Sequence, residues 1–211
     1  MKRYVILISG RGSNMQSLLD ARLPGECAAV ISNRADAAGL QLASARGIAC
    51  LTIDHRQFSS REDFDAALAQ EIDRYSPELV LLAGFMRILT DSFVRHFEGR
   101  LLNIHPSLLP SFPGIRTHEQ ALVAGVRVHG ATVHFVTSAL DGGPIVAQAA
   151  VPVHAGDDPA SLAQRVLAEE HLLYPRVARW FLEGRLHLEA GCSKLDDETP
   201  FEAALHVPAA D

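Results

Sequence analysis

The stretch YVILISGRGSN, Tyr4 to Asn14, joins a short apolar run to a turn that contains two glycines. The apolar run, residues 4–9, has the length and near-continuous hydrophobicity of a parallel β-strand covered on both faces. Residues 14–21 then show helical spacing, and Ser13 or Asn14 can cap the start of that helix. A buried strand, a glycine turn and a helix in this order predict the start of a βαβ unit, with the strand near the centre of a sheet.

The same alternation of strand and helix patterns continues as far as residue 105. We expect further strands at 27–32, 50–53, 79–83 and 101–105, and helices near 37–46, 61–75 and 91–97. Strands that alternate with helices form parallel sheets with helices on both faces, because each crossover must return over one face of the sheet. The sequence therefore predicts an α/β fold, a Rossmann-like three-layer sandwich with a mostly parallel central sheet.

The pattern changes after residue 105, where three prolines and a glycine within 106–114 predict a loop. A short helix is expected at 117–124. Residues 129–136 and 145–153 then alternate small, polar and β-branched side chains around a turn that begins at Asp141. This pattern predicts an antiparallel β extension towards the C-terminal end of the chain.

The last part of the chain contains one long helical pattern and one stretch without a pattern. Residues 159–184 carry leucine and valine at helical spacing, which predicts a long C-terminal helix that Pro175 can break. From Ala190 onward there is little periodicity. We therefore expect one domain over residues 1–189 and a loosely ordered tail over residues 190–211.

The composition excludes several classes of function. The chain has 211 residues, 48% of them hydrophobic, and a formal net charge of −6. A negative chain without a local basic patch has no general attraction for polyphosphate, so we expect small-molecule partners and no nucleic acid. The three cysteines lie far apart, which is typical of reduced thiols. Without an apolar stretch near ~18 residues or a signal-peptide pattern, the protein is expected to be cytoplasmic and not to bind membranes.

The first expected strand ends in a glycine loop, residues 10–14, which then opens a helix. Its backbone N–H groups and the positive end of the helix favour an anion such as a single phosphate. A dinucleotide fingerprint would need a third glycine where Met15 stands, and a carboxylate near the end of the second strand. Arg34, at that position, leaves binding of an NADP 2′-phosphate open, and a tight turn without a ligand is the other alternative.

Asn103 and His105 lie two residues apart in an otherwise apolar strand, so both side chains point to the same face at its carboxyl end. An imidazole there can act as a general acid, a general base or a charged clamp on an oxyanion, and the carboxamide adds a second donor. A carboxylate that keeps the imidazole charged would complete the set, and Asp141 is our candidate. The same residues also fit a structural histidine and an ordinary turn aspartate.

Six longer motifs resemble a known family: ISGRGSNMQSLL, SNRADAAGL, VLLAGFMRILT, GRLLNIHPSLLPSFPGIRTHEQAL, HGATVHFVTSALDGGPIVAQAAVPV and EEHLLYPRVARWFLEGRL. In this order and spacing, over about residues 4–188, they resemble the phosphoribosylglycinamide formyltransferase family, the folate-dependent enzymes of purine biosynthesis. The resemblance implies transfer of the formyl group of 10-formyltetrahydrofolate, the co-substrate, to the amine of 5-phosphoribosylglycinamide.

The resemblance also implies a role for particular residues. The catalytic set would be Asn103, His105 and Asp141, the substrate phosphate would bind at Gly12, Ser13 and Asn14, and Glu170 would bind the ribose hydroxyls. The folate would bind along the segment that lines the pterin pocket, along the stretch that ends at the aspartate, and at an arginine near its glutamate tail; these residues are Arg61, Met86, Arg87, Ile88, Leu89, Asn103, Thr137, Ser138, Ala139, Leu140 and Asp141. No role for Arg116 follows from the resemblance.

The chemistry so implied needs no metal and no covalent enzyme intermediate. His129 and His134 also lack partners at the spacing of metal ligands, so no metal is expected. The alternatives are formyltetrahydrofolate deformylase, which would use the same residues on water, and a nucleotide- or folate-binding module without catalysis. Methionyl-tRNA formyltransferase would need a second domain and a basic surface, for which this chain has neither room nor charge. We expect a monomer or a weak homodimer.

Overall fold

The computed structural model describes residues 1–198 and residue 207. Within these residues, one sheet contains seven strands in the order β3-β2-β1-β4-β5-β6-β7. Their bounds are β1 Arg3–Ile8, β2 Glu26–Ser32, β3 Ala49–Thr52, β4 Leu79–Leu82, β5 Leu101–His105, β6 Val128–Phe135 and β7 Ile145–Pro152. The first five strands pair in parallel, and β6 and β7 are added antiparallel, β6 to β5 and β7 to β6. The predicted extension is therefore part of the main sheet.

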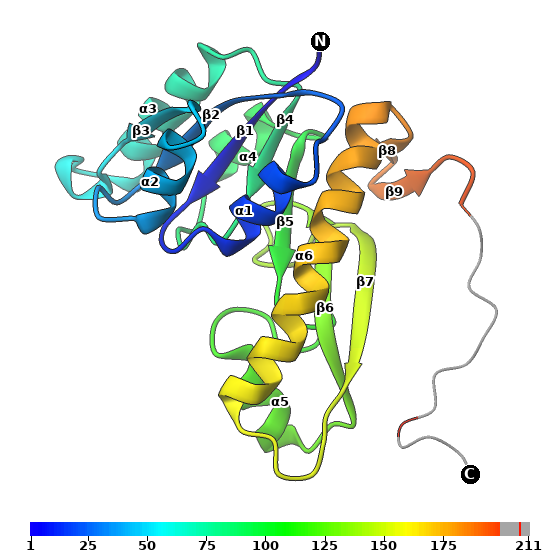
Figure 1. Ribbon diagram of the computed structural model, residues 1–211. Helices are drawn as coiled ribbons and strands as arrows, with labels where there is room; N and C mark the ends of the chain where they lie inside the picture. The colour runs from blue at the N-terminus through cyan, green and yellow to red at the C-terminus, as the bar shows by residue number, and fades with distance from the viewer. Residues whose placement is uncertain (199–206, 208–211) are drawn as a thin grey trace.

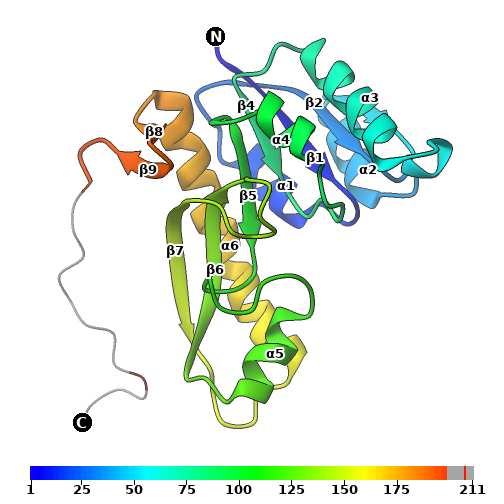
Figure 2. The same ribbon diagram turned by 180° about the vertical axis from the view of Figure 1, so that it is seen from behind.

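Helices cover both faces of this sheet, as the alternating pattern predicted. Side chains of α1 (Ser13–Asp20), α2 (Ala38–Ser44), α5 (Thr117–Ala124) and α6 (Pro159–Glu183) pack in one apolar cluster, and side chains of α3 (Arg61–Asp73) and α4 (Asp91–His96) in the other. In β1, Tyr4, Ile6 and Ile8 belong to the first cluster and Val5 and Leu7 to the second. Figure 1 looks onto the face with α1 and α6, and Figure 2 onto the face with α3 and α4. The three-layer α/β prediction is confirmed.

The strand order reverses at β1, which pairs with β2 on one side and with β4 on the other. Because the strands on the two sides of β1 connect in opposite directions across the sheet, the loops that follow them diverge. A crevice therefore opens at the carboxyl ends of the strands. The loops after β1, β4 and β5 surround this crevice. The fold thus places the glycine loop and the end of β5, Asn103 to His105, together at the carboxyl ends of the parallel strands.

In the C-terminal part, the structure differs from the sequence pattern at two places. Helix α6 runs through Pro175 without a break, because buried side chains on either side, among them Tyr174 and Val177, hold it against the sheet. Residues 190–198 are also not a loose tail. Strand β9 (Cys192–Leu195) pairs with β8 (Leu186–Glu189) around a turn whose two residues, Ala190 and Gly191, both have positive φ.

This hairpin packs against the edge strand of the main sheet. The Ser193 hydroxyl donates a hydrogen bond to the Ile145 carbonyl at the start of β7, and Leu195 packs against the first apolar cluster. The predicted domain boundary between residues 189 and 190 falls in the hairpin turn. The rest of the predicted tail, apart from residue 207, lies outside the described residues. A short 3-10 helix, η1 (His55–Gln57), was not predicted. Nowhere in the described part of the chain is a helix both long and apolar enough to span a membrane.

Candidate active site

A cavity of about 480 Å³ opens where the strand order reverses. It is lined by the end of β5, by the loop after β4, by residues 136–141, by the loop before α5, and by single residues from α1 and α6. Asn103, His105 and Asp141 all border it, together with Asn14 and Glu170. Residues that are far apart in the sequence therefore share one crevice.

Asn103 and His105 both face the cavity, as the alternation along β5 predicted. In the sheet register Asn103 lies opposite His134 of β6, and its Nδ2 donates to His134 Nε2 over 3.1 Å. His134 Nδ1 lies 2.9 Å from the Phe135 carbonyl and can donate to it, so the acceptor at Nε2 requires a neutral ring. Burial also lowers the pKa of His134. One N–H of the Asn103 carboxamide remains free to face a ligand.

His105 and Asp141 form a pair of ionisable side chains in the site. His105 Nδ1 lies 3.6 Å from Asp141 Oδ1, and both side chains are at least nine-tenths buried. His105 Nε2 donates to the Phe112 carbonyl over 3.1 Å. A protonated ring would thus have an acceptor at each nitrogen, and the buried carboxylate offsets its charge.

The turn that carries Asp141 has an unusual backbone. Asp141 itself has φ of 50°, a conformation that most residues other than glycine avoid. At Gly143, two residues later, a Cβ atom would lie 1.8 Å from the Phe135 carbonyl oxygen. Only glycine fits there, so the turn lies directly on β6, and Asp141 reaches over the end of β5. Asp141 Oδ2 in turn accepts the Gly114 N–H over 2.8 Å, which ties the loop before α5 to the site.

Of the glycine loop, residues 10–14, only Asn14 lines the cavity. Gly12 has φ of +78° and lies so close to Gly39 that a Cβ atom would come within 2.9 Å of the Gly39 Cα atom. Asn14, at the start of α1, donates from Nδ2 to Glu170 Oε2 on α6 over 2.6 Å. Glu170 is buried, which raises its pKa against the opposing effect of that hydrogen bond. Gly12 and Ser13 lie beside this pair without lining the cavity.

The predicted folate-binding residues fall into two groups. Residues 86–89 and 137–141 all line the cavity. Met86, Ile88 and Leu140 keep more than half of their surface exposed there, so a flat apolar ligand would find contact surface on both sides. Arg61, at the start of α3, does not line the cavity. Arg87 does, and its guanidinium lies 5.8 Å from the centre of the Phe64 ring.

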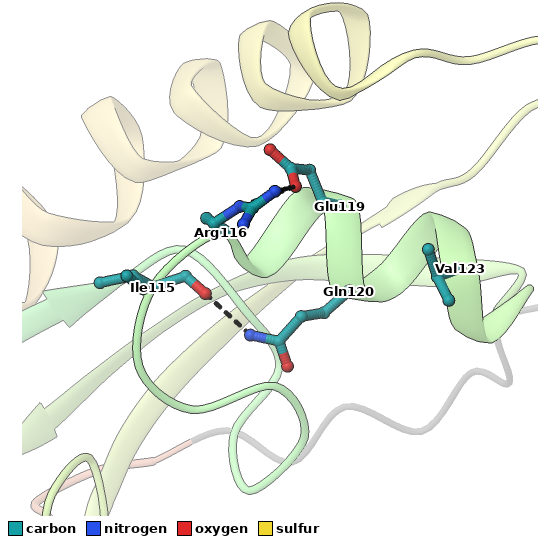
Figure 3. A pocket seen from close by; sticks show the side chains of 5 residues that line it. All are labelled: Ile115, Arg116, Glu119, Gln120 and Val123. Atoms are coloured by element: carbon teal, nitrogen blue, oxygen red, sulfur yellow. Dashed lines mark hydrogen bonds and ion pairs between the residues drawn. The ribbon is translucent and has the colours of Figure 1, made fainter.

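Arg116 borders the same cavity and also a second, shallower hollow beside α5 of about 370 Å³. Figure 3 shows that its guanidinium faces Glu119 of the next helical turn, with an Nε–Oε2 distance of 2.8 Å, and that the Gln120 amide reaches the Ile115 carbonyl. Arg116 is thus engaged with its own helix.

The NADP alternative loses support at this edge. Arg34, the residue considered for an NADP 2′-phosphate, makes two hydrogen bonds to Asp36, of 3.0 and 2.7 Å. Asn33, directly after β2, is hydrogen-bonded to Ser9 and to His55 of η1 (His55–Gln57). In the part of the chain that the structure describes, no cluster of three or more histidine, cysteine or acidic side chains could hold a metal ion.

A half-buried carboxamide, a buried imidazole and a carboxylate around one cavity are groups that can stabilise an oxyanion at an acyl carbon, as in enzymes of acyl transfer. The profile of the formyl transferase family matches residues 2–178. The Escherichia coli K12 phosphoribosylglycinamide formyltransferase is 52% identical over 198 residues, which are 92% of this chain and 93% of that protein. The human trifunctional purine biosynthetic protein adenosine-3 is 47% identical over 190 residues, 88% of this chain and 19% of that one.

Solved structures agree with this relationship. A glycinamide ribonucleotide transformylase from Symbiobacterium toebii superimposes with a TM-score of 0.90 at 50% identity, covering 93% of this chain and 95% of that one. The phosphoribosylglycinamide formyltransferase of Coxiella burnetii gives a TM-score of 0.90 at 48% identity, with 92% and 93% of the two chains covered. The chain belongs to the formyl transferase family, and within it to the phosphoribosylglycinamide formyltransferases.

Proposed function

We propose that this enzyme transfers the formyl group of 10-formyltetrahydrofolate to the amino group of 5-phosphoribosylglycinamide by direct attack of the amine. The observation that carries the proposal is the meeting of Asn103, His105 and Asp141 in one cavity with the Asn14–Glu170 pair at its side. Family membership and the names of the relatives support the same reaction. Nothing in the site favours one of the alternatives.

The two substrates would enter from opposite sides of the catalytic residues. The phosphate would bind at the start of α1, on the backbone N–H groups of Gly12, Ser13 and Asn14, where the helix end favours an anion. Glu170 would accept hydrogen bonds from the ribose hydroxyls. The pterin and the ring next to it would lie between residues 84–89 and 137–141. The glutamate tail would extend towards Arg61, outside the cavity.

In the transfer step, the lone pair of the neutral amine attacks the formyl carbon, and the carbonyl electrons move to the oxygen. The second N–H of Asn103 and the Nε2–H of a protonated His105 stabilise this oxyanion, which takes the place of the Phe112 carbonyl at Nε2. Asp141 Oδ1, 3.6 Å from Nδ1, would offset the positive charge of that ring. The tetrahedral intermediate collapses as its bond to the folate nitrogen breaks, and the proton lost by the amine passes to that nitrogen.

The remaining proposals concern the setting of the enzyme. We place it in the cytoplasm, where free thiols persist, because Cys27, Cys50 and Cys192 are unpaired among the described residues. We propose that it works as a monomer or weak homodimer on small molecules alone.

One experiment separates the reaction from its alternatives. Purified enzyme, 10-formyltetrahydrofolate and phosphoribosylglycinamide are mixed, and tetrahydrofolate formation is followed by absorbance with and without the amine. Formation that depends strictly on the amine, together with a formylated product, supports the transferase. Equal formation in its absence would identify a deformylase, and no formation at all would leave only a binding module.

A further inference from the structure

The loop that joins β4 to α4, residues 84–90, forms one wall of the proposed folate site. Its tip projects from the core, since Met86 is 68% and Ile88 59% exposed. An apolar wall of this kind binds a flat ligand tightly only if it is already held in place, because ordering it on binding would reduce the affinity. What holds this loop is therefore part of how the folate is recognised.

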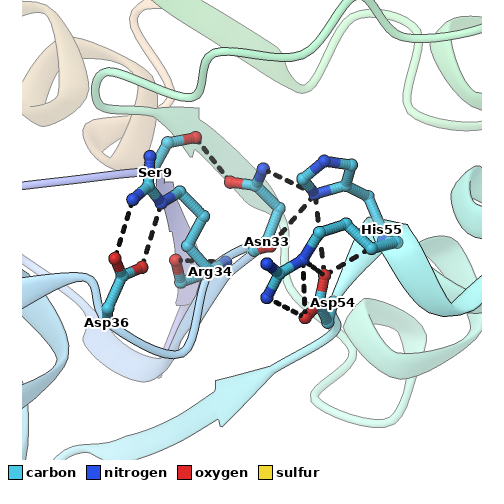
Figure 4. A network of polar contacts seen from close by, with 8 residues as sticks. Ser9, Asn33, Arg34, Asp36, Asp54 and His55 are labelled. Atoms are coloured by element: carbon cyan, nitrogen blue, oxygen red, sulfur yellow. Dashed lines mark hydrogen bonds and ion pairs between the residues drawn. The ribbon is translucent and has the colours of Figure 1, made fainter.

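The first half of the loop is held by Ser9, the residue after β1. The Met86 N–H donates to Ser9 Oγ over 2.8 Å, and the Ser9 hydroxyl donates to Asn33 Oδ1 over 2.6 Å. Figure 4 shows the chain of contacts continuing from Asn33 to the His55 ring, where the Nδ2–Nδ1 distance is 3.2 Å. Ser9 and Asn33 are both buried. The hydroxyl both accepts and donates, so it is fixed and presents its lone pair to the loop.

At its second end, the loop is held by Asp65, a residue of α3 that the proposed reaction does not use. The Thr90 N–H donates to Asp65 Oδ2 over 2.5 Å. Asp65 is only 2% exposed, and Oδ1 has no hydrogen-bond partner among the described residues. Its burial raises its pKa, against the lowering effects of the bond from Thr90 and of Arg61 and Arg87.

A buried carboxylate with one unpaired oxygen lowers the stability of the fold, whereas an aliphatic side chain at the same position of α3 would not. The bond to Thr90 is the feature that the carboxylate supplies and an aliphatic residue would not. Ser9 and Asp65 thus bond the first and the last residue of the segment 86–90, and neither lines the cavity.

We propose that Ser9 and Asp65 are positioning residues that set the affinity for the folate by holding residues 86–90 at both ends. The inference rests on the proposed function, because it takes this loop to be a wall of the folate site. The two residues act through the backbone N–H groups of Met86 and Thr90 and make no contact with the substrates.

The test replaces each residue with alanine in the full chain and measures both substrates. In Ser9→Ala and Asp65→Ala, the KM for 10-formyltetrahydrofolate and the Kd for tetrahydrofolate, measured by calorimetry, are expected to rise about tenfold, as loss of a buried hydrogen-bond partner predicts. The KM for phosphoribosylglycinamide and kcat should change less than about twofold. A merely destabilised enzyme would lose active molecules and so lower the maximal rate without changing either KM.

Two further variants serve as rescue and control. Asp65→Asn keeps an oxygen acceptor of the same size and is expected to restore the folate KM. Asp157→Ala removes a carboxylate that likewise accepts a backbone N–H, from His154 over 2.8 Å, in a loop away from the cavity. It should lower the melting temperature and leave both KM values unchanged. A folate KM that rises in Asp65→Asn as much as in Asp65→Ala would overturn the hydrogen-bond explanation.

Hydrogen exchange provides a readout that does not depend on turnover. The amides of residues 84–90 should exchange faster in both alanine variants than in the wild type. Unchanged exchange, or equal rises in the KM of both substrates, would overturn the inference. A wild-type enzyme that forms no tetrahydrofolate from this substrate pair would instead overturn the proposed function, and the exchange data would still decide whether the loop is held.

Discussion

Asn14 Nδ2 donates to Glu170 Oε2 over 2.6 Å, although the two residues are 156 positions apart. The bond joins the start of α1 to the middle of α6 at the edge of the cavity. It leaves Glu170 a buried carboxylate with a neutral partner.

Replacing Glu170 with Gln should weaken substrate binding and stabilise the fold. The raised pKa means that folding favours the neutral carboxyl, so its charge destabilises the protein as pH rises above the unfolded value of 4.5. Gln is neutral and can still accept from Asn14. We expect the KM for phosphoribosylglycinamide to rise about tenfold and the melting temperature at pH 7 to stay equal or increase. A lower melting temperature with an unchanged KM would contradict both parts.

Replacing Asn103 with Ala should slow catalysis without weakening substrate binding. The variant loses one donor to the oxyanion, which lowers turnover on the order of 10²-fold in comparable sites. Calorimetry should give an unchanged Kd for phosphoribosylglycinamide, because its phosphate would bind at α1. Loss of that binding would point to a disturbed fold and not to a missing donor. His105→Ala should lower kcat at least as much, and intact turnover there would refute the mechanism.

Replacing Gly143 with Ala should reduce kcat by moving Asp141. The added Cβ would lie 1.8 Å from the Phe135 carbonyl oxygen, so the turn must shift away from β6. We expect at least a ~10-fold lower kcat, since small displacements of catalytic groups are costly. Gly99→Ala is the control: Gly99 has positive φ, 73°, which strains an alanine, but no atom lies within 4 Å of its Cβ position. The control should lose about 1 kcal/mol of stability and keep its kcat.

The fold should lose stability in mild acid because of His129. This fully buried ring has its pKa lowered to about 4, first by burial and then by His118, 3.2 Å away. A histidine with a lowered pKa contributes stability that is complete above pH ~6.5 and is lost as pH falls towards 4.

Urea denaturation of wild type and His129→Asn at pH 7.5 and pH 4.5 measures this contribution. Between these two pH values the wild type should lose up to about 3 kcal/mol more of its free energy of unfolding than the variant. His134, which is not bonded to His129, titrates in the same direction in both proteins and its contribution therefore cancels. Equal losses would show that His129 does not titrate in this range.

Local patterns were enough for most of the architecture. The predicted strand 101–105 and helix 117–124 agree with β5 and α5 to the residue, because alternation, caps and helix breakers act over a few neighbours. The β8–β9 hairpin was missed, since its strands have only four residues each and β9 carries no alternating pattern. Pro175 can break a helix, but α6 continues through it because of packing that is not local and that a sequence pattern does not reveal.

The sequence by itself determined the α/β class and the edge of the sheet to which Asn103, His105 and the glycine loop belong, because both depend on short-range periodicity and motifs. Only the tertiary structure decided that His134 orients Asn103, that Asn14 meets Glu170, and that Ser9 and Asp65 hold residues 86–90. Each of these contacts joins separate elements, and their geometry follows from how helices and strands pack, which no local pattern encodes.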